Sequence, residues 1–154
     1  MDDFSIAIGS DDAATDLKNS IMAFLKEQGF HVEDFGDLCL DGTSYPDVAY
    51  ELATSIRSGI HQRGILFCGT GIGMAITANK VPGIRAAQAH DTYSAQRARK
   101  SNNAQILTLG ARVIGTELAK EIVKAFLESE FEAGRSGPKV ERIQFYENVS
   151  NKKD

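Results

Sequence analysis

The chain has 154 residues, of which 42% are hydrophobic and 25% charged, and its formal net charge at pH 7 is −4. This length favours one domain with its own buried core, and the acidic balance argues against nucleic acid as a partner. No apolar run is long enough to span a bilayer, and the first residues lack the basic and apolar regions of a signal peptide. We therefore expect a cytoplasmic protein that makes no membrane contact.

The residue types that hold metals are few and scattered. Cys39 and Cys68 show no metal-type spacing, and the three histidines, His31, His61 and His90, lie far apart in the sequence. The sequence therefore predicts free thiols, no zinc site and no cofactor.

Short apolar strands alternate with amphipathic helices along the chain. In chain order the pattern predicts a strand at 4–9, a helix at 13–28, a strand at 31–35, a loop at 36–44, a helix from Pro46 to about Gly59, a strand at 64–67, a short helix through Met74, a strand at 84–89, a helix of about ten residues capped by Asp91, a strand at 104–109, a helix at 115–129 and a final helix after Arg135. We expect a single domain over 1–149, followed by a flexible charged tail at 150–154.

Five strands separated by helices predict an α/β fold: a three-layer, doubly wound, Rossmann-like parallel sheet with a C-terminal helix. We expect the strand order 2-1-3-4-5, which puts the topological switch between the first and third strands. Ligands bind there, beyond the carboxyl ends of the strands. The segments that follow those two ends, residues 10–12 and 68–73, should therefore share one crevice.

The second of these segments, Cys68-Gly69-Thr70-Gly71-Ile72-Gly73, follows the apolar run 64–67 directly. The N–H groups of such a turn can hold an oxyanion, and the positive end of the following helix favours a thiolate over a thiol. It is not a dinucleotide fingerprint, because Met74 stands where the third glycine would be. A base beside an oxyanion cradle suits proton abstraction next to a carbonyl.

Simpler structural roles remain open for the same side chains. On the residues alone, Asp11 and Asp12 are better explained as helix caps, and most lone cysteines such as Cys68 are small buried apolar residues. His90, which precedes the Asp91 cap, fits a structural histidine equally well. The remaining candidates also fit ordinary turn or surface positions: Asn102, Arg112, Arg135 and Lys139.

Seven motifs in order carry a family resemblance over nearly the whole chain: Ile8-Gly9-Ser10-Asp11, Tyr45-Pro46-Asp47, residues 68–73, Ala78-Asn79-Lys80-Val81-Pro82-Gly83-Ile84-Arg85, Ser101-Asn102-Asn103-Ala104-Gln105, Gly110-Ala111-Arg112-Val113-Ile114-Gly115 and Gly134-Arg135. In these motifs the chain resembles the type B ribose-5-phosphate isomerase family, which includes the galactose-6-phosphate isomerase subunits. The resemblance implies an enzyme that interconverts aldose and ketose phosphates through a cis-enediolate without metal. It also implies a homodimer or tetramer whose active sites lie between subunits.

The resemblance also implies a role for each matching residue. Cys68 would be the base that moves a proton between C1 and C2, and Thr70 and Asp11 would handle the hydroxyl protons. N–H groups from Gly69, Gly71, Ile72 and Gly73 would stabilise the enediolate oxygen. Asn102 and Arg112 would come from the partner subunit, whereas Arg135 and Lys139 would hold the phosphate. Further substrate contacts are expected at Asp12, Tyr45, His90 and Ser101.

Two departures from the family pattern bear on the substrate. The usual aspartate–histidine pair is Asp11-Asp12 here, and Ser101 replaces a histidine that is thought to open the sugar ring. Ribose 5-phosphate closes to a furanose through its free O4, whereas a tetrose 4-phosphate has O4 esterified and cannot. Residues 90–94 and 101–105 also resemble the tetrose-phosphate branch of the family.

The sequence therefore favours an isomerase of D-erythrulose 4-phosphate and D-erythrose 4-phosphate. Two alternatives stay open. His90 or Asp12 could open the ring in an ordinary ribose-5-phosphate isomerase, or the chain could be a non-catalytic sugar-phosphate-binding subunit.

Overall fold

A computed structural model describes residues 5–36 and 45–152, so Cys39 and most of the expected loop at 36–44 lie outside the described residues. Every strand and helix predicted from the sequence is present, and they follow one another along the chain as predicted. The strands are β1 (Ser5–Ser10), β2 (His31–Asp34), β3 (Arg63–Cys68), β4 (Ala86–Gln88) and β5 (Ile106–Gly110). The helices are the short 3-10 helix η1 (Asp12–Ala14), α1 (Thr15–Glu27), α2 (Tyr45–Arg57), α3 (Ile72–Ala78), α4 (Thr92–Lys100), α5 (Thr116–Leu127) and α6 (Ala133–Asn151).

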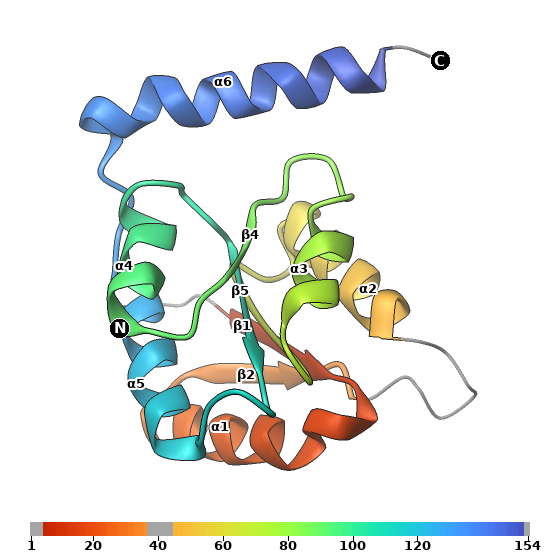
Figure 1. Ribbon diagram of the computed structural model, residues 1–154, viewed down its shortest axis with the longest axis vertical. Coiled ribbons are helices and arrows are strands. Elements are labelled where there is room, and N and C mark those ends of the chain that lie inside the picture. Colours follow the sequence, from red (N-terminus) through yellow and green to blue (C-terminus); the bar gives the residue numbers. More distant parts are fainter. Residues whose placement is uncertain (1–4, 37–44, 153–154) are drawn as a thin grey trace.

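The five strands form one parallel sheet in the order β2-β1-β3-β5-β4, with helices on both faces (Figure 1). The predicted fold class is confirmed, but the predicted order of the last two strands is wrong. All five residues of β5 are buried, whereas β4 has three residues and none of them is buried. A strand inside a doubly covered sheet must be apolar on both faces, and a short, partly exposed strand suits an edge.

This strand order decides which helices cover which face. After β3 the chain crosses over through α3 to β4, at the edge of the sheet, and leaves the position between β3 and β4 empty. It then crosses back through α4, and β5 fills that position. Because parallel crossovers are right-handed, the reversal places α4 on the face opposite to α3. Helices α1, α4 and α5 therefore share one face, and α2 and α3 share the other (Figure 1).

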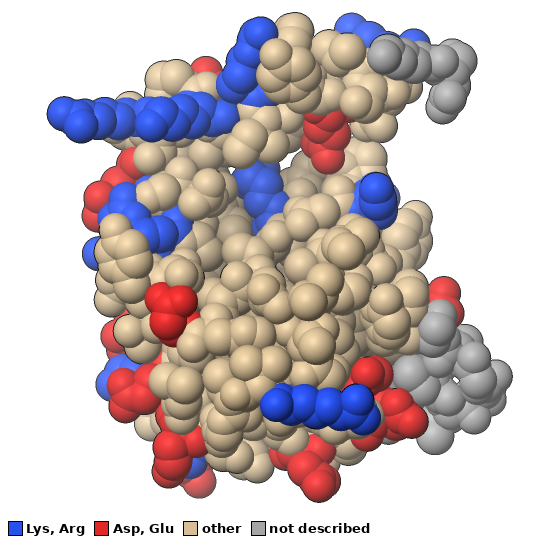
Figure 2. Space-filling view, viewed as in Figure 1, with Lys and Arg blue, Asp and Glu red and all other residues tan. Residues whose placement is uncertain are grey.

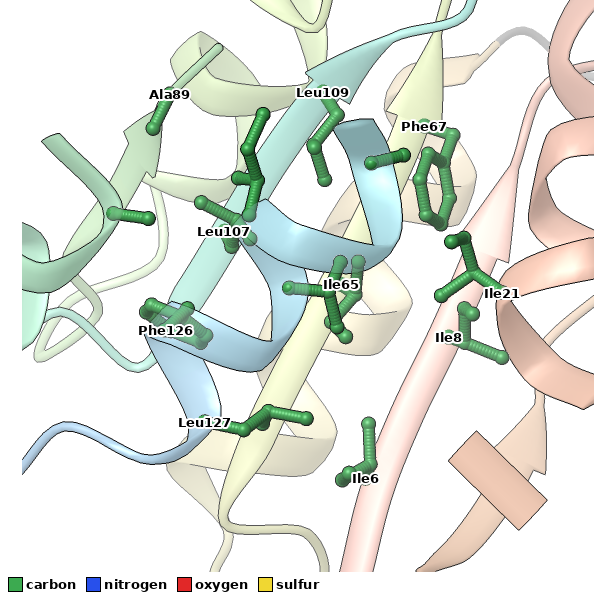
Figure 3. Close-up of a cluster of buried hydrophobic side chains, with 14 of the residues drawn as sticks. Ile6, Ile8, Ile21, Ile65, Phe67, Ala89, Leu107, Leu109, Phe126 and Leu127 are labelled. Carbon is green, nitrogen blue, oxygen red and sulfur yellow. The ribbon is translucent and has the colours of Figure 1, made fainter. Parts of the chain in front are cut away.

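Each face of the sheet has its own apolar core. Alternate residues of β3 enter the two cores: Ile65 and Phe67 join the cluster that holds Ile21 of α1 and Phe126 of α5, part of which Figure 3 shows. Leu66 and Cys68 point to the other face, toward α2 and α3. Cys68 is therefore fixed at the end of a strand that is packed on both sides.

Helix α6 lies apart from these layers, across the amino end of the sheet (Figure 1). It begins with a break at Gly134, and none of its residues is buried. Its links to the body include the N–H of Glu132, which donates to the Lys100 carbonyl at 3.1 Å, and Glu147, which accepts from the N–H of Gly83 at 2.9 Å. No helix in the described ranges is long and apolar enough to cross a membrane.

Candidate active site

Strands β1, β3 and β5 end side by side, at the carboxyl end of the sheet. Ser10 pairs with Phe67, and Cys68 pairs with Gly110. The N–H of Asp11 then donates to the Phe67 carbonyl at 3.1 Å. The predicted convergence of residues 10–12 and 68–73 is thus observed.

Cys68 lies at the bottom of a tight turn between β3 and α3. Only 6% of the residue's surface is exposed, and its Sγ accepts a hydrogen bond from the N–H of Gly71 at 3.0 Å. Gly71 has φ +80°, and a Cβ at this position would lie 2.9 Å from the backbone of Leu109. A glycine is therefore required for the turn to close on the sulfur. The next N–H, that of Ile72, donates to Thr70 Oγ1 at 3.2 Å.

Asp11 faces this turn as the cap of η1, where its carboxylate accepts from the N–H of Ala14 at 3.1 Å. The pKa of Asp11 is raised above its ordinary value, chiefly by burial and secondly by the negative charge of Asp12. Hydrogen bonds from the N–H groups of Ala14 and Ala13 and the positive charge of Arg112 act in the opposite direction. A carboxyl group in this balance is suited to exchanging protons with a substrate hydroxyl.

An Asp12→Asn variant should lower the pKa of Asp11 but leave it above the ordinary value, because burial is the larger cause. A carboxyl whose folded-state pKa is raised stabilises the fold below its unfolded-state pKa, and this contribution is lost as pH rises through the folded-state pKa. The variant should therefore gain thermal stability over the wild type at pH 7, and the gain should vanish at pH 3.

NMR titration of the Asp11 carboxyl carbon and thermal unfolding at both pH values measure these effects. Asp16→Asn is the matched control, because Asp16 occupies the first turn of the neighbouring helix and does not act on Asp11. An unchanged Asp11 titration in Asp12→Asn would contradict the assignment.

Two further predicted residues lie against the turn, Arg112 and Tyr45. The N–H of Arg112 donates to the Gly69 carbonyl at 3.1 Å, and its side chain lies over Gly69. Tyr45, the first residue of α2, has its ring against Gly73, where a Cβ would collide with it. Arg112 therefore lies beside the Cys68 turn of its own chain, and its expected contribution to the partner's site stays a prediction.

His90, two residues after the end of β4, also lies at the carboxyl end of the sheet. Its Nε2 accepts the N–H of Gly110 at 2.9 Å. An amide N–H can only donate, so Nε2 is the acceptor in this contact. This contact gives His90 a structural role at the end of β5, and its expected contact with substrate stays a prediction.

The other predicted residues lie at the opposite end of the sheet. Ser101 and Asn102 end α4 just before β5, and both bond to the Arg97 carbonyl. Arg135 and Lys139 are exposed on the first turns of α6, where Figure 2 shows basic side chains gathered. The chain thus carries two separate groups of predicted site residues, one at each end of the sheet.

Two residues that the sequence analysis did not single out also contact the turn. Gln88 of β4 donates through Nε2 to the Thr70 carbonyl at 2.7 Å, and Thr108 of β5 donates through Oγ1 to the Gly71 carbonyl at 2.7 Å. Thr108 is the one polar side chain in the otherwise apolar strand Ile106–Gly110, and this could have indicated that its hydroxyl has a specific hydrogen-bond partner. Elsewhere, a surface hollow of about 530 Å³ between α1 and α5 contains none of the predicted site residues. The described residues include no group of three His, Cys, Asp or Glu placed to hold a metal ion.

Sequence comparisons find relatives along almost the full chain. A family model described as Ribose/Galactose Isomerase matches residues 6–143. A D-erythrulose-4-phosphate isomerase of Pectobacterium atrosepticum is 66% identical over 145 residues, covering 94% of this chain and 95% of the relative. A Ribose-5-P isomerase B of Listeria innocua is 50% identical, covering 90% and 94%.

The fold has equally similar solved counterparts. The structure of Clostridium thermocellum ribose-5-phosphate isomerase B matches with a TM-score of 0.91 at 44% identity, covering 95% of this chain and 99% of that one. Family model, sequence relatives and structure agree: the chain belongs to the ribose/galactose isomerase family, whose named relatives here are sugar-phosphate isomerases.

Proposed function

We propose that this enzyme interconverts D-erythrulose 4-phosphate and D-erythrose 4-phosphate through a cis-enediolate, with Cys68 as the base. The observation that carries the proposal is the position of Cys68: its sulfur accepts the Gly71 N–H at the switch point of the sheet, beside Asp11 and Arg112. A donor aimed at the sulfur gives negative charge there a hydrogen-bond partner. The reaction needs such a base beside groups that hold an oxyanion.

The proton steps balance without a cofactor. The Cys68 thiolate removes a proton from C1 of the ketose, and the electron pair moves to the C2 oxygen to form the enediolate. Asp11 and Thr70 pass the hydroxyl proton from O1 to O2, and the thiol returns its proton to C2 to give the aldose. N–H groups of residues 69–73 and the Arg112 charge stabilise the oxyanion.

The proposal includes a second copy of the chain, which supplies the phosphate site. Helix α6, which carries Arg135 and Lys139, lies across the amino end of the sheet (Figure 1), whereas Cys68 is the last residue of β3, at the carboxyl end. The helix that carries them also exposes a set of large apolar side chains: Ile143, Phe145, Tyr146 and Val149. An apolar face this exposed is typical of an interaction surface. A homodimer in which each α6 reaches the partner's carboxyl edge would cover this face and complete both sites.

Two observations favour a tetrose over a pentose. Ring opening of ribose 5-phosphate needs a group that can accept or deliver a proton, and His90 cannot take one at Nε2 without breaking its bond to Gly110. Ser101 offers no titrating side chain in the place of the family histidine. In addition, the 66% identical relative from Pectobacterium atrosepticum is named a D-erythrulose-4-phosphate isomerase, whereas the Ribose-5-P isomerase B from Listeria innocua is 50% identical.

The purified protein should be assayed separately with D-erythrulose 4-phosphate, D-ribose 5-phosphate and D-ribulose 5-phosphate. We expect kcat/KM for the tetrose to exceed that for ribose 5-phosphate by about tenfold or more. D-Ribulose 5-phosphate cannot close to a furanose because its O5 is esterified, so it reports pocket fit apart from ring opening. Faster turnover of ribose 5-phosphate than of the tetrose would replace the proposal with ribose-5-phosphate isomerase. No turnover of any of them would favour a binding subunit.

A further inference from the structure

The turn that holds Cys68 is anchored by all four of its successive carbonyl groups. The carbonyls of Cys68 and Gly69 accept backbone N–H groups that follow β5, from Ala111 at 2.8 Å and Arg112 at 3.1 Å. The Thr70 carbonyl accepts the side chain of Gln88. The Gly71 carbonyl accepts both the Thr108 hydroxyl at 2.7 Å and, in the first turn of α3, the N–H of Ala75 at 3.2 Å.

The two side-chain anchors act on particular peptide groups. A peptide is planar and trans, so fixing its carbonyl also fixes the direction of its N–H on the opposite side. The peptide that Gln88 holds through the Thr70 carbonyl carries the N–H of Gly71, which donates to Cys68 Sγ at 3.0 Å.

The same arrangement is repeated one residue later. Thr108 holds the Gly71 carbonyl at 2.7 Å, and the N–H of that peptide belongs to Ile72, which donates to Thr70 Oγ1 at 3.2 Å. Thr108 is fully buried, so its hydroxyl has no water to bond instead. Two of the groups proposed to move protons, Cys68 Sγ and Thr70 Oγ1, are thus each aligned by a peptide that a side chain of β4 or β5 holds.

We propose that Gln88 and Thr108 are positioning residues of this site, which orient the peptide N–H groups that align Cys68 and Thr70. The inference rests on the proposed function for its catalytic meaning, but the geometry itself does not depend on the substrate. Neither residue touches the reacting atoms in this role. Donors in a chain of hydrogen bonds also polarise one another, so the Gln88 amide strengthens the N–H that faces the sulfur.

The buried anchor is tested with Thr108→Val, which removes the hydroxyl and keeps the shape. Because the change affects alignment and not substrate binding, kcat should fall by about tenfold with little change in KM. Thr108→Ser restores a hydroxyl and should recover most of kcat. Thr54→Val is the matched control, because Thr54 also donates to a backbone carbonyl, that of Tyr50 at 2.8 Å, but on α2 away from the turn.

Loss of kcat in Thr108→Val without recovery in Thr108→Ser would overturn the proposed role of the hydroxyl. Unchanged kcat in Thr108→Val would do the same. Thermal unfolding of all three variants separates these outcomes from a failure to fold.

The exposed anchor is tested with Gln88→Met, which keeps the length of the side chain and removes the donor. The readout is alkylation of Cys68 by iodoacetamide, followed on the Cys68 peptide by mass spectrometry so that Cys39 is read separately. The rate at pH 9 reports access to the sulfur, and the ratio of rates at pH 7 and pH 9 reports how well the site supports the thiolate. This ratio should fall by about threefold in Gln88→Met.

Gln62→Met is the control for this change. The side-chain amide of Gln62 accepts the Ser5 N–H and donates to the Gly59 carbonyl. Gln62 precedes β3, so these bonds lie at the amino ends of the strands, away from the Cys68 turn. Its alkylation ratio should match that of the wild type. An unchanged ratio in Gln88→Met would overturn the role of Gln88.

The alkylation assay needs no isomerase activity, so the two proposals can fail separately. A wild type without turnover would remove the proposed function while the alkylation ratios still decide the positioning role. Conversely, if Cys68→Ser abolishes turnover while Gln88→Met and Thr108→Val behave as the wild type, the function stands and the positioning role is wrong.

Discussion

A Cys68→Ser variant should lose isomerase activity by about a thousandfold or more while remaining folded. The serine hydroxyl can still accept the Gly71 N–H that now donates to the sulfur at 3.0 Å, so the turn should keep its shape. A hydroxyl, however, is a far weaker acid than a thiol, and it supplies almost no anion to remove a proton from carbon at neutral pH. The variant thus separates the structural part of Cys68 from its proposed chemistry.

Two measurements together distinguish loss of proton abstraction from loss of a later step. Turnover is followed with the tetrose phosphate, and exchange of substrate carbon-bound hydrogen in D2O is followed by NMR, because exchange reports proton abstraction even where product does not accumulate. Cys39→Ser is the matched control and should retain wild-type activity. Isomerisation or exchange near the wild-type rate in Cys68→Ser would show that another group is the base.

The features that sequence could predict are those encoded by neighbouring residues. The apolar run 64–67 followed by a glycine-rich turn predicts a buried strand and a tight connection, and Cys68 lies at that junction with 6% of its surface exposed. Asp91 followed by a helical pattern predicts a cap, and its carboxylate accepts the Ser94 N–H at 2.7 Å. Both predictions depend on local backbone geometry alone.

The features that it could not predict depend on which strands become neighbours. The order of β4 and β5 follows from the crossover hand and from the burial that each strand receives, and neither is visible in a single local pattern. Gln88 and Thr108 meet the Cys68 turn only because β5 lies beside β3 and β4 beside β5. The contact of Arg112 with Gly69 likewise exists only once β5 is placed next to β3.

The separation of the site residues into two groups leads to a second large effect, seen when two inactive variants are mixed. Cys68→Ser removes the base at the carboxyl end of the sheet, and an Arg135→Ala, Lys139→Ala double variant removes the phosphate-binding charges on α6. Each should be nearly inactive alone. If α6 serves the partner's site, a mixed dimer has one site with both lesions and one site with neither.

Random pairing makes half of the dimers mixed, so the mixture should regain about a quarter of wild-type activity. Co-expression with two different tags, with the mixed dimer confirmed by native mass spectrometry, provides the sample. The matched control pairs Cys68→Ser with Asp11→Asn, because both residues belong to the carboxyl-end group of one chain. That mixed dimer has one lesion in each site and should stay inactive. No recovery in the first mixture would show that α6 does not complete its partner's site. Recovery in the control would show that Cys68 and Asp11 of one chain do not share a site.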